Sequence, residues 1–200
     1  MNDSNKKRLI LRYYLLGKSF NNAVKAFEYS KDLHVGKRKD GVTPEFDHQV
    51  DIALYIKTIH EQLLYPEDTF SAVFLHDTPE DKDIGFEEID VLFGRQVMSA
   101  VKLLTKKHRG EKMPIDYYYK LIADDPIASV VKGADRMHNI QHMQSCFTKE
   151  KQLKYIEETE ELVLPMLKTS KRTFVQQENI YENIKLILLS QIDLLKKINA

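Results

Sequence analysis

The feature that most limits how this chain can fold is the spacing of its apolar residues, which recur mostly three or four positions apart. This is the spacing of one face of an α-helix, whereas a half-buried strand alternates at every second residue. Strand-like alternation bounded by turn pairs is nearly absent, and only seven glycines and six prolines interrupt the 200 residues. We therefore predict an all-α fold.

The glycines and prolines divide the chain into expected helices. The first should span 6–16, and Ser19 is a candidate N-cap for a second helix that ends near His34. Glycine and proline predict a loop over 35–46, and a polar loop is expected over 106–114. The remaining helices are expected at about 47–64, 68–78, 86–93, 95–105, 115–124, 127–143, 149–168 and 178–198.

Charge is balanced, with 30 Lys and Arg against 30 Asp and Glu, so composition gives no reason to expect attraction to nucleic acid or to a membrane surface. No apolar run approaches the roughly 20 residues of a membrane helix. Arg12 interrupts the apolar N-terminal stretch, which we interpret as a first helix rather than a signal peptide. The one cysteine, Cys146, allows no intrachain disulfide and fits a reducing compartment. We expect a single domain over residues 1–200 in the cytoplasm, and nothing in the sequence indicates an oligomeric state.

The stretch FLHDTPEDKDIG, residues 74–85, places a His-Asp pair at the end of an apolar segment. Imidazole and carboxylate are ligands that a divalent metal such as Mn²⁺ accepts without sulfur. Adjacent residues on a helix point about 100° apart, so His76 and Asp77 could share an ion only in a groove between helices. His48, from the preceding helix, and Asp135, from a later one, are placed to complete such a cage.

Two acids follow the pair, and Pro79 disfavours helical backbone at the residue before it. This places Glu80 and Asp81 on a turn beyond the helix end, where acids are commonly solvated. Taken singly, His48 would be an ordinary histidine at a helix start, and Asp135 would form a surface ion pair with Arg136. The ordered occurrence of all these residues favours a site over the separate explanations.

The histidines near Asp135 have a different interpretation. His138 and His142 are spaced i, i+4 on one helix, a spacing that can bind metal. We interpret His138 as a core histidine or a support for a metal ligand, and His142 as a residue at the edge of a cleft. Asp135 and Asn139 share the same helical spacing, so both should project into one cleft.

The order His48, His76-Asp77, Asp135 is the pattern of the HD phosphohydrolase superfamily, which this chain resembles. Four segments look like the hydrolase domain of the RelA/SpoT alarmone enzymes: RKDGVTPEFDH (38–48), FLHDTPED (74–81), FGRQVMSAVKLLTK (93–106) and VKGADRMHNI (131–140). The resemblance covers roughly residues 20–170, with C-terminal helices continuing to 200. In layout the chain is closest to the small stand-alone alarmone hydrolases.

The resemblance implies an HD-domain helical bundle with a metal site between helices. It implies Mn²⁺ as the cofactor, a small-molecule nucleotide as the partner, and removal of pyrophosphate from the 3′ position of guanosine tetra- and pentaphosphate. The implied metal ligands are His48, His76, Asp77 and Asp135. The implied water-activating pair is Glu80 and Asp81, and the implied nucleotide contacts are Arg38, Lys39 and Asn139. Since 200 residues leave no room for a following synthetase domain, we expect an enzyme that only degrades the alarmone.

The sequence departs from the family pattern without deleting a ligand. Gln49 stands where proline is usual, Asp51 where a small or apolar residue is usual, and Gly133 where Leu or Ala is frequent. The base preference therefore stays open. The alternatives are another HD nucleotide phosphohydrolase (an adenine alarmone hydrolase, a nucleotidase or a dinucleotide-cofactor phosphatase), a nucleotide-sensing module without catalysis, or a purely structural bundle.

Overall fold

The computed structural model describes residues 3–108 and 110–199. The helices are α1 (Asp3–Gly17), α2 (Asn21–Leu33), α3 (Asp47–Ile59), α4 (Pro66–Leu75), α5 (Thr78–Asp81), α6 (Phe86–Phe93), α7 (Arg95–Leu104), α8 (Ile115–Ala123), α9 (Pro126–His142), α10 (Lys149–Glu158), α11 (Leu164–Thr173) and α12 (Glu178–Asn199). Short 3₁₀ turns occupy His60–Gln62, Met143–Ser145 and Val175–Gln177. The two strands, β1 (Lys107–His108) and β2 (Glu111–Lys112), form a small antiparallel hairpin. The all-α prediction is confirmed.

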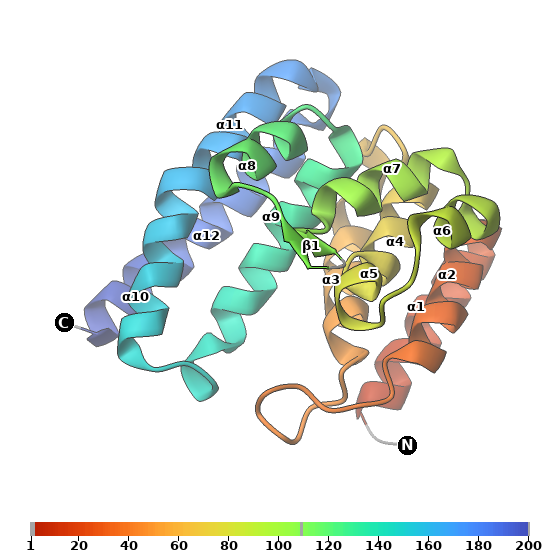
Figure 1. Ribbon diagram of the computed structural model, residues 1–200, viewed down its shortest axis with the longest axis horizontal. Coiled ribbons are helices and arrows are strands. Elements are labelled where there is room, and N and C mark those ends of the chain that lie inside the picture. The colour runs from red at the N-terminus through yellow and green to blue at the C-terminus, as the bar shows by residue number, and fades with distance from the viewer. Residues whose placement is uncertain (1–2, 109, 200) are drawn as a thin grey trace.

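Helix α9 is the centre of the bundle. It packs against α3, α4 and α7 on one side and against α8, α11 and α12 on the other. Figure 1 shows the N-terminal helices and the C-terminal helices on opposite sides of the molecule, with α9 between them. Because neighbours surround it, α9 buries residues around most of its circumference, as a helix in the middle of a core must.

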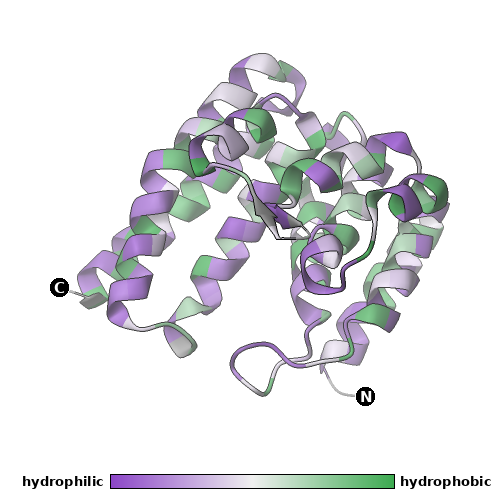
Figure 2. Cartoon of the chain, viewed as in Figure 1, coloured by the Kyte–Doolittle hydropathy of each residue, from purple (hydrophilic) through white to green (hydrophobic). Residues whose placement is uncertain are grey.

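The outer helices are amphipathic. Helices α1, α10 and α12 carry both hydrophilic and hydrophobic residues, and the loop over 35–46 is mostly hydrophilic (Figure 2). Within the described residues, no helix has both the length and the apolar character that crossing a bilayer requires.

Helix α9 begins and packs for reasons that are local in the sequence. The Asp125 carboxylate accepts hydrogen bonds from the N–H groups of Ile127 and Ala128, at 2.9 and 2.7 Å, and so caps the helix. Farther along, a Cβ atom on Gly133 would lie 3.0 Å from Leu167 Cδ2 and 3.1 Å from Ile184 Cγ2. The glycine therefore lets α11 and α12 approach the α9 backbone closely.

Several predicted helix starts were wrong. Ser19 does not cap α2: it has φ 59°, its N–H bonds to the carbonyl of Leu16, and α2 begins after Phe20 with no side-chain cap. The chain turns too sharply after α1 for Ser19 to adopt the extended backbone of an N-cap. Helix α4 begins at Pro66 and not at the expected residue 68, since a proline in the first helical turn needs no N–H partner.

The segment after α4 is more helical than expected. Helix α4 ends at Leu75, and Thr78–Asp81 forms a separate helical turn with Pro79 in its first turn. The N–H of Asp81 donates to the carbonyl of Asp77 at 2.9 Å. Glu80 and Asp81 therefore lie within α5 and not on a turn beyond a helix.

Two other segments also differ from the prediction. The loop expected over 106–114 contains the β1–β2 hairpin, and Arg109 within it lies outside the described residues. The helix expected over 149–168 continues through a π-helical turn, Thr159–Val163, and into α11. The boundary at Gly94, where φ is 90°, agrees with the expected break between α6 and α7.

Candidate metal centre and nucleotide cleft

Four predicted ligands meet where α3, α4 and α9 come together. His48 lies in the first turn of α3, His76 and Asp77 follow α4, and Asp135 is in the middle of α9. His48 Nε2 lies 3.2 Å from Asp135 Oδ1 and 3.7 Å from Asp77 Oδ2. His76 Nε2 lies 3.2 Å from Asp77 Oδ2 and 3.8 Å from Asp135 Oδ1. Donor atoms that share one ion at bond lengths of about 2.1 Å are spaced in this way.

Hydrogen bonds on the far side of each ring orient the two imidazoles. His76 Nδ1 lies 2.8 Å from the carbonyl oxygen of Val73, so Nδ1 carries the proton and Nε2 presents a lone pair to the carboxylates. His48 Nδ1 lies 2.9 Å from His138 Nδ1. A proton on His48 Nδ1 satisfies that contact and leaves Nε2 of His48 as an acceptor too.

With both imidazoles neutral, the four inward atoms are two imidazole lone pairs and two carboxylate oxygens, all of them metal-ligand atoms. Such a set is unfavourable when buried unless a cation lies between its members. The side chains of His48, His76 and Asp135 are 5%, 4% and 7% exposed, whereas that of Asp77 is 38% exposed and opens to solvent. His48, His76 and Asp77 form a group that can hold a divalent metal ion, and Asp135 Oδ1 lies 3.2 and 3.8 Å from its two imidazoles.

Without an ion, the two histidines differ in proton affinity. Burial lowers the pKa of His48 to about 4, despite the attraction of Asp135 and Asp77. Burial also acts to lower the pKa of His76, but Asp77 and Asp135 outweigh it and raise the value to about 9. Burial acts to raise the pKa of Asp135, yet Lys132 and the two imidazoles hold it well below the usual value. The pKa values of these neighbouring groups are thus shifted strongly and in different directions, which is frequent at functional sites.

Lys132 is a residue that the sequence did not single out. Its Nζ lies 2.9 Å from Asp135 Oδ2 and 5.8 Å from the centre of the Tyr118 ring, and its side chain is 17% exposed. Lysine three residues before a ligand lies on the same face of the helix, and that spacing is the signal that could have revealed it. Asp135 therefore has a lysine on one oxygen, and its other oxygen faces the two histidines.

A second set of contacts lies on the Nδ1 side of the His48 ring and runs through His138. His138 Nε2 lies 3.7 Å from Asp51 Oδ2, and Asp51 Oδ1 accepts a hydrogen bond from Lys7 Nζ at 2.9 Å. His142 Nδ1 lies 2.9 Å from the carbonyl oxygen of His138 and stacks on its ring. The geometry agrees with His138 as a support for a ligand, and it gives Asp51 a place in the same chain of contacts.

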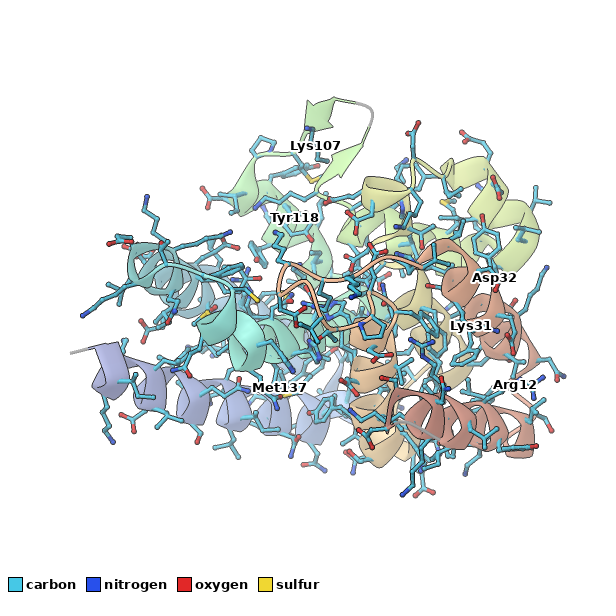
Figure 3. The ribbon with its side chains drawn as sticks, turned by 90° about the horizontal axis from the view of Figure 1, so that it is seen from below. Arg12, Lys31, Asp32, Lys107, Tyr118 and Met137 are labelled. Atoms are coloured by element: carbon cyan, nitrogen blue, oxygen red, sulfur yellow. The ribbon has the colours of Figure 1, made fainter. Side chains whose placement is uncertain are left out.

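The metal centre lies on the wall of a cleft of about 670 Å³. This volume is in the range of sites that hold a small molecule. One side of the cleft is formed by the loop 35–46, which crosses the middle of the view between Met137 and Asp32 in Figure 3. Cationic side chains are frequent in the lining: Lys37, Arg38, Lys39, Lys132 and Lys151. Seven carboxylates line it too: Asp40, Glu45, Asp47, Asp51, Asp77, Asp81 and Asp135. An anionic ligand would therefore bind to the cationic side chains and to a metal ion that offsets these carboxylates.

The predicted nucleotide contacts all line this cleft, and two of them touch. Arg38 Nη2 donates to Asn139 Oδ1 at 3.1 Å, and Asn139 Nδ2 donates to Asp135 Oδ1 at 2.5 Å. Lys39 Nζ lies 5.9 Å from the centre of the Phe147 ring, which the sequence did not single out. The loop and α9 are therefore linked directly at the metal ligand.

The predicted catalytic pair is divided. Asp81 lines the cleft, whereas Glu80 accepts hydrogen bonds from the backbone N–H groups of Lys106 and Lys107, the second at 2.7 Å. Partial burial, then the carboxylates of Asp77 and Glu45, raise the pKa of Asp81. Of the two acids, Asp81 is thus the one that the structure brings to the cleft.

Asp135 does not form the surface ion pair that was the alternative explanation for it. Arg136 is 2% exposed and points the other way, where Nη2 donates to Tyr119 Oη at 2.7 Å and pairs with Glu158. Its guanidinium also lies 3.8 Å from the centre of the Tyr155 ring. Arg136 therefore ties α9 to α10 and leaves Asp135 facing the histidines.

Comparison with known proteins adds independent findings. A family model described as "HD domain" matches residues 26–166. Over 149 residues the chain is 32% identical to a guanosine-3′,5′-bis(diphosphate) 3′-pyrophosphohydrolase of Aquifex aeolicus, covering 71% of this chain and 20% of the relative. Over 152 residues it is 31% identical to a probable enzyme of the same name from Synechocystis sp., covering 71% and 19%. This chain therefore spans about a fifth of the length of these curated relatives.

One more relative and a solved structure are similar. The chain is 32% identical over 148 residues to a GTP pyrophosphokinase of Streptomyces coelicolor, covering 71% of this chain and 17% of the relative. A solved structure described as a metazoan ortholog of SpoT that hydrolyzes ppGpp matches with a TM-score of 0.61 at 24% identity, over 81% of this chain and 94% of that chain. At this identity the likeness shows a shared fold.

Proposed function

Because this chain belongs to the HD domain family, we propose that it is a metal-dependent hydrolase that removes the 3′-pyrophosphate of guanosine tetra- and pentaphosphate-type alarmones. The observation that carries the proposal is the convergence of two imidazole nitrogens and two carboxylates on the wall of a cleft that also carries five cationic side chains. The Aquifex aeolicus and Synechocystis relatives, which are named as 3′-pyrophosphohydrolases, support the choice of substrate.

The proposed ion is Mn²⁺, with His48, His76, Asp77 and Asp135 as ligands. When bound, a divalent ion offsets the charge of the pyrophosphate and lowers the pKa of a coordinated water. Two residues orient the imidazole ligands: the carbonyl of Val73 contacts His76, and His138 contacts His48. Fixing ligand orientation from behind in this way usually raises metal affinity.

Asp81 is the proposed proton acceptor. Its carboxylate lines the cleft one helical turn after Asp77, where it would orient the attacking water and take its proton. A raised pKa makes it a better acceptor than a solvated aspartate. Glu80 contributes by position: its bonds to the N–H groups of 106 and 107 hold α5 against the hairpin.

Arg38, Lys39 and Asn139 are the proposed nucleotide contacts. Arg38 and Lys39 offer positive charge from the loop, and Asn139 offers an amide from α9. Since Arg38 and Asn139 bond to each other, a nucleotide entering the cleft would exchange that bond for bonds to itself. This exchange would couple substrate binding to the position of the loop.

The test is to supply Mn²⁺ with a panel of 3′-pyrophosphorylated guanine and adenine nucleotides and to identify the released product. We expect pyrophosphate from the guanine compounds and no turnover by Asp77→Asn or His76→Ala at retained helical content. Release of single phosphate would indicate a nucleotidase or a dinucleotide-cofactor phosphatase, and preference for adenine would indicate an adenine alarmone hydrolase. Tight binding without product would indicate a sensor. Wild-type turnover in either variant would refute the metal centre.

A further inference from the structure

A second group of potential ligands lies beside the first centre. It consists of His34, just after α2, Glu45 in the loop 35–46, and Asp81 at the end of α5. One potential ligand atom from each lies within 4.8 Å of the others. Neither His34 nor Glu45 has a part in the hydrolysis proposed above, so their convergence on Asp81 needs its own explanation.

The state of the His34 ring is set by its neighbours. Nδ1 lies 3.0 Å from the carbonyl oxygen of Ser30, which can only accept, and 3.1 Å from the Ser30 hydroxyl; the proposal uses the tautomer in which Nδ1–H donates to the carbonyl. Nε2 is then a lone pair. The side chain is buried, with 2% of the residue exposed, and Nε2 has no hydrogen-bond partner among the described residues. A buried acceptor that faces carboxylates and lacks a donor calls for a cation.

The surrounding charges point the same way. Glu45 Oε2 lies 2.9 Å from Lys82 Nζ, which is the cation that the structure places on this carboxylate. Asp81 faces the negative charges of Asp77 and Glu45, and its pKa is raised by partial burial and by both of them. Negative charge therefore exceeds positive charge around His34 Nε2.

We propose that His34 Nε2, Glu45 and Asp81 form a second site for a divalent cation. One imidazole with two carboxylates suits Mn²⁺, Fe²⁺ or Zn²⁺. Ligands at about 2.1 Å from one ion are at most about 4.2 Å apart, whereas these three atoms lie within 4.8 Å of one another, so the side chains would move together when the ion binds. Glu45 would release Lys82 in doing so, and water would complete the coordination.

The site adjoins the first one, because Asp81 follows Asp77 by one helical turn. A carboxylate has two oxygens, so Asp81 can hold an ion with one of them and orient a water with the other. The assignment is independent of the proposed substrate, since counting bound ions requires no nucleotide.

The experiment is to strip the full chain with a chelator, titrate it with Mn²⁺ and, separately, with Zn²⁺, and measure bound metal by equilibrium dialysis. We expect two ions per chain. Glu45→Gln and His34→Gln should weaken the second binding step by at least about tenfold, as loss of a ligand does, and leave the first step unchanged. Lys82→Gln should strengthen the second step, because the lysine competes with the ion for Glu45.

Three controls separate this site from the first. Glu61→Gln, an exposed carboxylate at the other end of α3, should bind two ions like wild type. Asp77→Asn should weaken the first step and keep the second, and the Asp77→Asn, Glu45→Gln double variant should weaken both. One ion per wild-type chain with both metals, or two unchanged steps in Glu45→Gln, would overturn the proposal. If His34→Gln fails to fold, Glu45→Gln and Lys82→Gln decide the matter, since both residues are partly exposed.

Discussion

Replacing His138 by phenylalanine would test whether contacts behind the metal centre hold it in shape. His138 Nδ1 lies 2.9 Å from Nδ1 of the ligand His48, and its Nε2 lies 3.7 Å from Asp51. Phenylalanine keeps the volume of the ring and removes both nitrogens. The substitution therefore leaves His48 Nδ1 buried without a partner while changing no ligand.

The magnitude follows from these contacts. Loss of the group that orients a ligating histidine typically weakens metal binding by about 10- to 100-fold. That range equals about 1.4–2.8 kcal/mol at 25 °C. The apo protein should also lose about 1–3 kcal/mol of unfolding free energy, the usual cost of leaving one buried polar group unsatisfied.

The assay is a Mn²⁺ titration of chelator-stripped His138→Phe, with unfolding by urea measured in parallel. His142→Phe is the matched control, because the His142 ring stacks on His138 and its Nδ1 contacts the backbone carbonyl of His138. We expect the control to bind Mn²⁺ within about threefold of wild type, the ordinary context dependence of a neighbouring change. Wild-type affinity in His138→Phe at normal helical content would refute the reasoning that His138 supports His48.

Other predictions concern the pair on the far side of α9 and the two acids of α5. Arg136→Met should lower the unfolding free energy by about 3 kcal/mol in urea denaturation, the lower end for a broken buried pair, because Glu158 keeps some solvent contact. Burial acts to raise the pKa of Glu158, but Arg136 holds it below 4.5, so the pair stabilises the fold above that pH and the benefit is lost as pH falls. Glu158→Gln should therefore flatten the acid side of a stability-against-pH curve, and an unchanged slope would count against the pair. Asp81→Asn should keep the first Mn²⁺ and lower kcat at least about 100-fold, as measured by pyrophosphate release; an unaltered kcat would remove Asp81 from the mechanism. Glu80→Ala, which removes the acceptor for the N–H groups of Lys106 and Lys107, should also lower kcat because α5 loses its attachment to the hairpin, and an unaltered kcat would remove that role.

The helices were largely predictable because their signals are local. The spacing of apolar residues and the break at Gly94 depend on a few neighbours in the chain, and the structure agrees with both. The prediction failed where one residue type is common at two different positions relative to a helix. Proline serves in the first turn of a helix as well as after its end, so Pro66 and Pro79 were assigned to the wrong side of a boundary. Ser19 failed because the path of the chain, and not its own side chain, sets its backbone.

Some residues of the candidate site could be predicted from the sequence and others could not. His48 and Asp135 could be named from their types and their order, and the structure brings their atoms within 3.2 Å. Lys132 and Asp51 were not assigned to the site: Lys132 gains its role from a nearby residue that is itself a ligand, and Asp51 gains its role from His138, which is distant in sequence. His34 was treated as a helix end, since the exclusion of water from its ring is a property of the packed molecule alone.

The absence of a side chain at Gly133 has a consequence for dissection of the protein. With Leu167 and Ile184 resting nearly on its backbone, α9 takes its alignment from helices that supply none of the proposed ligands. Ile184 lies beyond residue 166, where the match to the family model stops. A fragment that ends at residue 166 would lose the side chains that fix the position of α9 and therefore of Asp135. We expect this fragment to be less stable and to bind metal more weakly than the full chain. Helix α12 is therefore needed for the proposed metal site although it supplies none of the proposed ligands.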